Sequence, residues 1–203
     1  MINLTIDGKE IQVAKGSMLL DACKIAGADL PTLCYDPELR LAGSCRMCVV
    51  EAKGRSNLLA ACVTPAENGM VIETESPDVV ETRKIILELL LARHKLECHT
   101  CESDGICKLQ DYCYRYGVKD SRFQGEGPDI YKVDPNPFIE RDYNKCIMCT
   151  RCVRACEEIT GARAINVEDR GHHAVISTAF NGNLADSPCV FCGQCVMVCP
   201  VGA

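Results

Sequence analysis

Hydrophobic and polar residues alternate at the start of the chain, as expected for paired β-strands. The alternation runs through Asn3-Leu-Thr-Ile, stops at Asp7-Gly8 and resumes through Ile11-Gln-Val-Ala. An Asp-Gly pair between two alternating runs is a strong signal for a β-hairpin. After the hairpin, Ser17 predicts a helix N-cap and Gly27 predicts the end of that helix.

Strand-like stretches follow at residues 48–52, 58–63 and 70–73. A hairpin, a crossing helix and later strands together predict a β-grasp arrangement for residues 1–76.

A longer helix is predicted after this domain. Ser76 is placed to cap it, Pro77 suits its first position, and apolar residues recur along it at helical spacing. A shorter helix at about residues 106–116 should end at Gly117. We therefore expect residues 77–120 to form a small helical domain.

Glycine and proline are frequent in residues 121–137, which predicts a linker. The final domain, residues 138–203, should contain a short hairpin around Asp169-Arg170-Gly171. The predicted fold class is α+β, with a β-grasp domain, a small helical domain and a third small domain in that order.

The charge and hydropathy patterns exclude several functions. The formal net charge of −6 argues against a nucleic-acid partner, because phosphate binding needs a basic face. Charged residues interrupt the longest apolar stretch, residues 79–91, so it falls short of the ~20 apolar residues of a membrane span. The sequence after Met1 has no pattern of an export signal. We expect a cytoplasmic protein without a membrane span.

The 17 cysteines are the most informative part of the composition. Small domains that cannot build a large core are commonly stapled by disulfides or by metal. Repeated Cys-x2-Cys steps gather thiolates around one small centre, the cysteine total is odd, and no export signal is visible. These three observations favour metal over disulfides.

The last two groups of cysteines share the spacing Cys-x2-Cys-x2-Cys-x3-Cys. In two-cluster ferredoxins with this spacing, the fourth cysteine of each group ligates the other cluster. The prediction is one [4Fe–4S] cluster on Cys146, Cys149, Cys152 and Cys199, and a second on Cys189, Cys192, Cys195 and Cys156. Residues 138–203 are therefore predicted to form a two-cluster bacterial-type ferredoxin domain. A zinc ribbon would require eight matching positions to be a coincidence.

The first group is Cys34, Cys45, Cys48 and Cys62, with ten residues in its first gap. Plant-type [2Fe–2S] ferredoxins have the same order of gaps but a shorter first gap. Four thiolates also suit tetrahedral zinc, so zinc stays open. Gly43 and Ser44 would let backbone amides turn toward cluster sulfurs, which favours a [2Fe–2S] cluster.

The second group combines one imidazole with three thiolates, in the order His94, Cys98, Cys101 and Cys107. This set suits a [4Fe–4S] cluster, with zinc again the rival. Cys113 could replace His94 as the fourth ligand, and His99 is a weaker candidate. Our hypothesis is that His94 ligates, while Cys113 and Cys23 pack as small apolar residues.

The four sets in this order resemble the N-terminal electron-transfer region of [FeFe] hydrogenase catalytic subunits, NAD(P)-linked formate dehydrogenase α subunits and the large peripheral subunit of respiratory complex I. The resemblance covers essentially the whole chain. It rests on the first two sets, on Lys145 to Cys156 and on Cys192 to Gly202. In that family the histidine is a cluster ligand, which supports His94.

The fourth set also distinguishes members of this family. The resemblance implies that the complex I subunit has lost most of the second ferredoxin half, whereas this chain keeps all four of its cysteines. The sequence around Tyr114–Val118 and Pro188–Cys195 is more similar to formate dehydrogenase α subunits. The prediction is therefore an electron relay of a formate dehydrogenase. A hydrogenase relay, a free-standing polyferredoxin and a structural zinc protein are the alternatives.

The resemblance implies one [2Fe–2S] and three [4Fe–4S] clusters, all bound through the residues named above. The expected partners are a flavin- and NAD(P)-binding diaphorase-type subunit or a ferredoxin. A catalytic domain with molybdopterin or a hydrogen-activating cluster is expected in the same longer polypeptide. No nucleotide-binding glycine motif occurs in the 203 residues, and we predict no catalytic residue among them.

Overall fold

The computed structural model describes residues 1–123 and 134–203. Contacts divide the chain into two compact units. The first unit comprises Met1–Tyr35 and Leu41–Ile86, and the second comprises Asp36–Arg40 and Leu87–Ala203. Most of the predicted linker, residues 124–133, lies outside the described residues.

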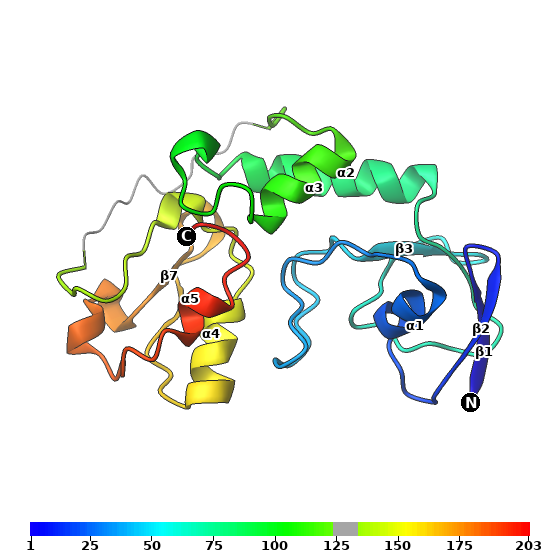
Figure 1. Ribbon diagram of the computed structural model, residues 1–203, viewed down its shortest axis with the longest axis horizontal. Helices are drawn as coiled ribbons and strands as arrows, with labels where there is room; N and C mark the ends of the chain where they lie inside the picture. The colour runs from blue at the N-terminus through cyan, green and yellow to red at the C-terminus, as the bar shows by residue number, and fades with distance from the viewer. Residues whose placement is uncertain (124–133) are drawn as a thin grey trace. The chain divides into compact units, whose positions relative to one another are not determined.

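The first unit is built on a five-stranded sheet with the order β2-β1-β5-β3-β4 (Figure 1). The predicted hairpin is confirmed, since β1 (Ile2–Ile6) and β2 (Lys9–Val13) pair in antiparallel register around Asp7-Gly8. Strand β5 (Val71–Glu73) runs parallel to β1 and antiparallel to β3 (Val49–Ala52). Strand β4 (Leu59–Ala60) extends the sheet beyond β3, and it is shorter than predicted.

Helix α1 (Leu19–Ala26) packs its apolar face into the core of this unit and ends at Gly27, as predicted. The predicted N-cap is wrong by one residue, because Met18 occupies that position and no side chain caps the helix. The amides of Leu19 and Leu20 instead donate to the carbonyls of Thr64 and Ala61, both at 2.9 Å. A neighbouring loop thus satisfies the first-turn N–H groups that a serine would otherwise serve.

Helix α2 (Pro77–Leu91) begins as predicted, with the Ser76 hydroxyl accepting from the Val79 amide at 3.4 Å. Helix α3 (Lys108–Tyr116) follows in the second unit and ends at Gly117, whose φ of 68° suits glycine. These helices and the sheet of the first unit confirm the α+β class. None of the helices in the described parts of the chain has the length and apolar character needed to cross a bilayer.

The rest of the second unit holds short elements that frame cysteines. Helix α4 (Arg151–Ala155) continues into a π-helix at Cys156–Thr160. The predicted hairpin is present as β6 (Asn166–Glu168) and β7 (Val175–Ser177), and α5 (Gln194–Met197) follows near the C-terminus. The small core consists of four buried residues, Ile139, Ile165, Ile176 and Leu184.

Segment Asp36–Arg40 belongs to the second unit although its neighbours in sequence belong to the first. Asp36 forms an ion pair with Arg151 of α4, and the Arg40 guanidinium lies 3.0 Å from the Glu158 carboxylate. The Arg40 amide also donates to Glu158 at 2.7 Å. Asp36 and Arg40 lie between Cys34 and Cys45. The long first gap of the first cysteine set therefore contributes ion pairs to the second unit.

Candidate iron–sulfur centres

The first cysteine set is gathered in the first unit. The amide of Cys34 donates to Cys45 Sγ at 3.4 Å, and the amide of Cys45 donates to Cys34 Sγ at 3.5 Å. Cys48 and Cys62 are buried in the same apolar core. Hydrogen bonding from Cys62 is the main influence on Cys48, and it lowers the pKa of that thiol to about 7. Cys34 also interacts with Cys62, so all four predicted [2Fe–2S] residues come together.

Gly43 is needed in the loop that leads to Cys45. Its φ is 61°, and a Cβ added there would lie 2.9 Å from Cγ1 of Val63. The side chain of any other residue would therefore collide with Val63 as well as strain the backbone. The glycine that the sequence singled out allows this close approach of the two loops.

The second set lies around one pocket of the second unit. His94, Cys98, Cys101 and Cys107 all line it, together with Lys145 and Gly202. Cys113 does not line this pocket, although it lies near Cys98 and Cys107. Burial is the main reason that the pKa of Cys113 is raised to about 11, as expected for a packed neutral thiol.

The environment of His94 favours the neutral form of its imidazole, which is the form that binds metal. Burial is the largest influence and lowers the pKa of His94, while the backbone carbonyl of Lys145 beside the ring acts in the opposite direction. The Nδ1 atom of His94 is buried without a hydrogen-bond partner. A buried, uncharged ring nitrogen beside three thiols is suited to metal binding.

The third and fourth sets exchange their last cysteines, as the ferredoxin spacing predicts. One pocket is lined by Cys189, Cys192 and Cys195 together with Cys156 from the other half of the motif. Cys199 in turn lies near the thiols of the first half, since its charge acts on Cys146, Cys149 and Cys152. Burial mainly raises the pKa of Cys149 to about 12, and the charges of Cys199 and Cys146 add to this effect.

The two halves of this motif have matching backbone geometry. Met148 and Phe191, each two residues after the first cysteine of its half, both have a φ of 53°, and their amides donate to that cysteine's sulfur at 3.4 Å. Thr150 and Gly193 also have positive φ, at 59° and 76°. Positive φ in a non-glycine residue is costly and is typical of functional sites.

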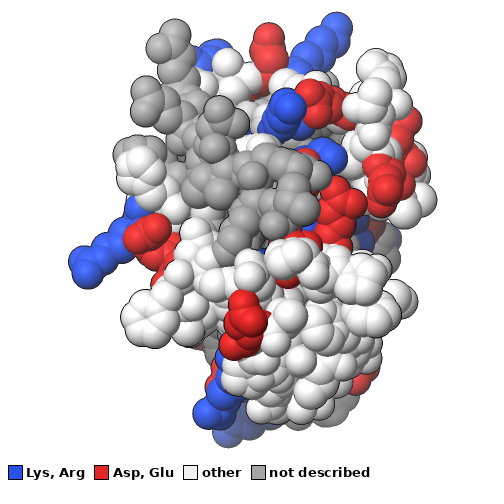
Figure 2. Space-filling model, turned by 90° about the vertical axis from the view of Figure 1, so that its left-hand side faces the viewer, with Lys and Arg blue, Asp and Glu red and all other residues white. Residues whose placement is uncertain are grey.

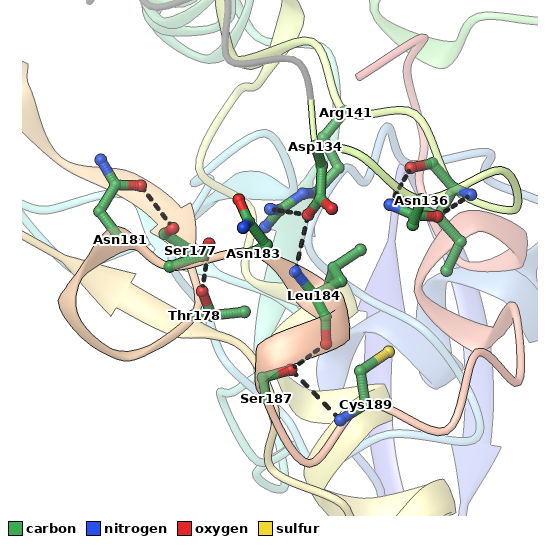
Figure 3. A network of polar contacts seen from close by, with 12 residues as sticks. Asp134, Asn136, Arg141, Ser177, Thr178, Asn181, Asn183, Leu184, Ser187 and Cys189 are labelled. Atoms are coloured by element: carbon green, nitrogen blue, oxygen red, sulfur yellow. Dashed lines mark hydrogen bonds and ion pairs between the residues drawn. The ribbon is translucent and has the colours of Figure 1, made fainter.

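A buried polar network holds the loop that precedes Cys189 (Figure 3). The Asp134 carboxylate accepts from the Leu184 amide at 2.7 Å and from the Arg141 guanidinium at 2.8 Å. The Ser187 hydroxyl donates to the Leu184 carbonyl at 2.7 Å and accepts from the Cys189 amide at 3.2 Å. The network thus connects a buried ion pair to the backbone of a predicted ligand.

Asp134 and Arg141 have no signal in the sequence, because the network depends on contacts between residues far apart in the chain. In the sequence, Arg83 is one of the charged residues that interrupt the apolar stretch 79–91. The available signal was its position, since Arg83 lies four residues after Val79 and four before Leu87, and all three are fully buried. That spacing places the charge on the buried face of the helix.

The chemistry of the donors bears on the choice between zinc and a cluster. Sets of thiolates, one of them completed by an imidazole, suit both tetrahedral zinc and iron–sulfur clusters. Within residues 1–123 and 134–203, no three side chains of His, Cys, Asp or Glu converge closely enough to bind one metal ion. The paired spacing of the last two sets is that of two-cluster ferredoxins, which favours clusters there.

Models of known families match three parts of the chain. Residues 1–77 match a 2Fe-2S iron-sulfur cluster binding domain, and residues 83–122 match the NADH-ubiquinone oxidoreductase-G iron-sulfur binding region. Residues 136–203 match the ferredoxin-like domain of NADH-quinone oxidoreductase subunit 3. The fold and the cysteine sets thus define an iron–sulfur electron-transfer module.

Individual relatives agree with this class. The chain is 44% identical to NADP-reducing hydrogenase subunit HndD of Solidesulfovibrio fructosivorans, spanning all of this chain and 36% of that protein. It is 43% identical to an NADH-quinone oxidoreductase polypeptide of Rhizobium meliloti, spanning all of this chain and only 24% of that protein. A crystal structure of NAD+-reducing [NiFe]-hydrogenase matches with 34% identity and a TM-score of 0.90, covering 100% of this chain and 86% of that one.

The chain belongs to the family of iron–sulfur subunits found in NADH-quinone oxidoreductases and NAD(P)-linked hydrogenases. The relatives include an NADH-quinone oxidoreductase polypeptide that aligns over the whole chain. The separation from complex I that was predicted from the fourth set is therefore not supported.

Proposed function

We propose that this chain carries single electrons through one [2Fe–2S] and three [4Fe–4S] clusters inside a larger NAD(P)-linked oxidoreductase. The ligands would be the sets Cys34/Cys45/Cys48/Cys62, His94/Cys98/Cys101/Cys107, Cys146/Cys149/Cys152/Cys199 and Cys189/Cys192/Cys195/Cys156. The exchange of Cys156 and Cys199 between the two halves carries this proposal. It is the arrangement that the ferredoxin spacing requires and that a chance grouping of cysteines would not produce.

The clusters would supply the redox chemistry, and the chain's own residues would hold them and set their potentials. The backbone amides that donate to Cys146 and Cys189 place positive dipoles beside sulfur, which favours the reduced, more negative state. The Thr160 hydroxyl lies 3.3 Å from Cys192 Sγ, within hydrogen-bond range. No acid–base residue is required for electron transfer.

His94, rather than Cys113, is our proposed fourth ligand of the second set. The pocket that gathers the three thiols includes the His94 ring and not Cys113. The unpartnered Nδ1 atom of His94 adds support, since a buried ring nitrogen without a partner is costly unless something binds it.

The C-terminal segment around Cys192, residues 178–203, would help to receive a protein partner. Residues 178–203 contain one charged side chain, Asp186, and Cys192 itself is exposed. Phe138, Val190 and Met197 are 65–81% exposed. Figure 2, which looks onto the second unit, shows a broad area with few charged side chains. Such a face suits an apolar, lasting contact more than a brief charge-guided encounter.

The surrounding complex is also a proposal. We infer that electrons pass between a flavin- and NAD(P)-binding subunit or a ferredoxin and a catalytic domain of a longer polypeptide in the cytoplasm. Hydrogenase and quinone oxidoreductase polypeptides are among the relatives described above. A formate dehydrogenase rests only on the sequence around Tyr114–Val118 and Pro188–Cys195, and a free-standing polyferredoxin remains the simpler alternative.

Metal analysis of the anaerobically purified chain tests the proposal. We expect brown protein with about 14 irons per chain, two from the [2Fe–2S] cluster and four from each [4Fe–4S] cluster. Cys192→Ala should remove one [4Fe–4S] signal from the EPR spectrum, whereas Cys23→Ala, a core substitution, should leave all signals in place. Stoichiometric zinc without visible absorption would exclude the relay.

A further inference from the structure

Arg83 is a fully buried charge in the first unit. Its side chain is 0% exposed, on the face of α2 that also buries Val79 and Leu87. Lysine and arginine are almost never fully buried unless they are paired. Its position therefore requires partners strong enough to replace water.

The partners of Arg83 lie on both sides of Cys48. The Nε atom donates to the carbonyl of Met47 at 3.1 Å, and Nη2 donates to the carbonyl of Val49 at 2.8 Å. The planar guanidinium holds its donors in a fixed fork, which matches two carbonyls on the same stretch of backbone. The backbone of Cys48 is thus held immediately before and after the predicted ligand.

The third partner neutralises the charge only in part. Nη1 of Arg83 lies 2.7 Å from Glu75, but the Glu75 side chain is 45% exposed, so solvent weakens its field. The charge of Arg83 also reaches the buried Cys23 thiol. Burial raises the pKa of Cys23 to about 12, the negative charge of Asp7 adds to this effect, and the positive charge of Arg83 opposes it. The charge of Arg83 is thus felt within the core that also buries Cys48.

We propose that Arg83 is a positioning and potential-setting residue of the [2Fe–2S] site. Its guanidinium fixes the backbone around Cys48, and its buried charge favours the reduced cluster, which carries one more negative charge. This inference rests on the proposed ligation of a [2Fe–2S] cluster by Cys48.

Potentiometric EPR titration of the [2Fe–2S] signal in the full chain tests the inference. Arg83→Gln should lower the potential, so that at the wild-type midpoint the ratio of reduced to oxidised cluster falls about tenfold, or 59 mV for one electron. Glu75→Gln should raise the potential, since it removes the counter-charge. Arg83→Lys keeps the charge without the fork, so it should restore most of the potential while altering the EPR line shape.

Arg55→Gln is the matched control, because Arg55 forms an exposed ion pair with Glu67 at 2.8 Å in the same unit. Its potential should equal that of the wild type. An unshifted potential in Arg83→Gln, or a lowered one in Glu75→Gln, would overturn the inference. If both Arg83 variants fail to fold, Glu75→Gln alone decides, and an unchanged potential counts against the inference. Absence of any wild-type [2Fe–2S] signal would instead refute the proposed function.

Discussion

Replacing Asp134 tests how much the buried ion pair stabilises the second unit. The Asp134 and Arg141 side chains are only 2% and 13% exposed, so solvent screening is weak. Removing one partner of a buried pair costs about 3–5 kcal/mol, because the other charge stays buried without compensation. Asp134→Ala also leaves the Leu184 amide without its acceptor. We therefore expect Asp134→Ala to lower the free energy of unfolding by about 3–5 kcal/mol.

Asp134→Asn should cost less, about 1.5–3 kcal/mol, because an amide oxygen still accepts from Leu184 but no longer carries the charge. The assay is anaerobic urea unfolding, followed by far-UV circular dichroism and by visible cluster absorption. With a slope of about 2 kcal/mol per M, the midpoint of Asp134→Ala should fall by about 2 M. The control is Asp186→Asn, an exposed carboxylate in the same loop, which should change stability by less than about 0.5 kcal/mol.

The pH dependence gives a second check on this prediction. Burial opposes ionisation of Asp134, but hydrogen bonds from Asn136 and Leu184 and the charge of Arg141 outweigh it and hold the pKa of Asp134 below its usual value. A depressed folded-state pKa gives stability that is complete above about pH 4 and is lost as the pH falls further. The difference in free energy of unfolding between wild type and Asp134→Asn should therefore stay constant from about pH 5 to 8. A difference below about 0.5 kcal/mol between wild type and Asp134→Ala, or one that disappears by pH 5, would refute the reasoning.

Three further substitutions test the cluster sites. His94→Ala should change the EPR signature of one [4Fe–4S] centre while Cys113→Ala leaves it intact, and the opposite pattern would make Cys113 the ligand. Cys199→Ala should remove the signal of the cluster in the first motif half and about four irons per chain; an unaltered iron content would contradict the exchange of ligands. Gly202→Ala should disturb the histidine-containing site, because the added Cβ would lie 2.5 Å from Cys101 Sγ, and a spectrum equal to that of the wild type would show that the tail can yield.

Local sequence signals predicted local structure well. The Asp7-Gly8 turn and the Ser76 cap both depend on residues within a few positions of one another, and both are present. The N-cap at Ser17 failed because amides of the first turn are satisfied by residues 61 and 64, which no local pattern reveals. Strand β4 was overpredicted for a related reason, since the chain turns away after Ala60 to bring Cys62 into its site.

Cysteine spacing predicted which thiols lie together, because metal-ligand geometry requires regular spacing in the sequence. The charged residues that hold the cysteine loops follow no such spacing. Asp134 and Arg141 flank a proline-rich turn and read as ordinary surface residues, yet their partner amide lies 50 residues from Asp134. The burial of Arg83 could be predicted only from its helical spacing with Val79 and Leu87, because its charge alone predicts an exposed residue. The grouping of the candidate ligands could be predicted from sequence, whereas the residues that hold their loops could be identified only in the folded chain.

The matched halves of the ferredoxin motif have a consequence for how the centres are loaded. In the proposed ligand sets, each half of the motif supplies three thiolates to its own cluster. Its fourth thiolate ligates the cluster of the other half. Two separate copies would have to meet before either cluster was complete. Joining them in one polypeptide replaces that encounter with an effective concentration on the order of millimolar. Cluster assembly in this domain should therefore proceed at a rate independent of protein concentration.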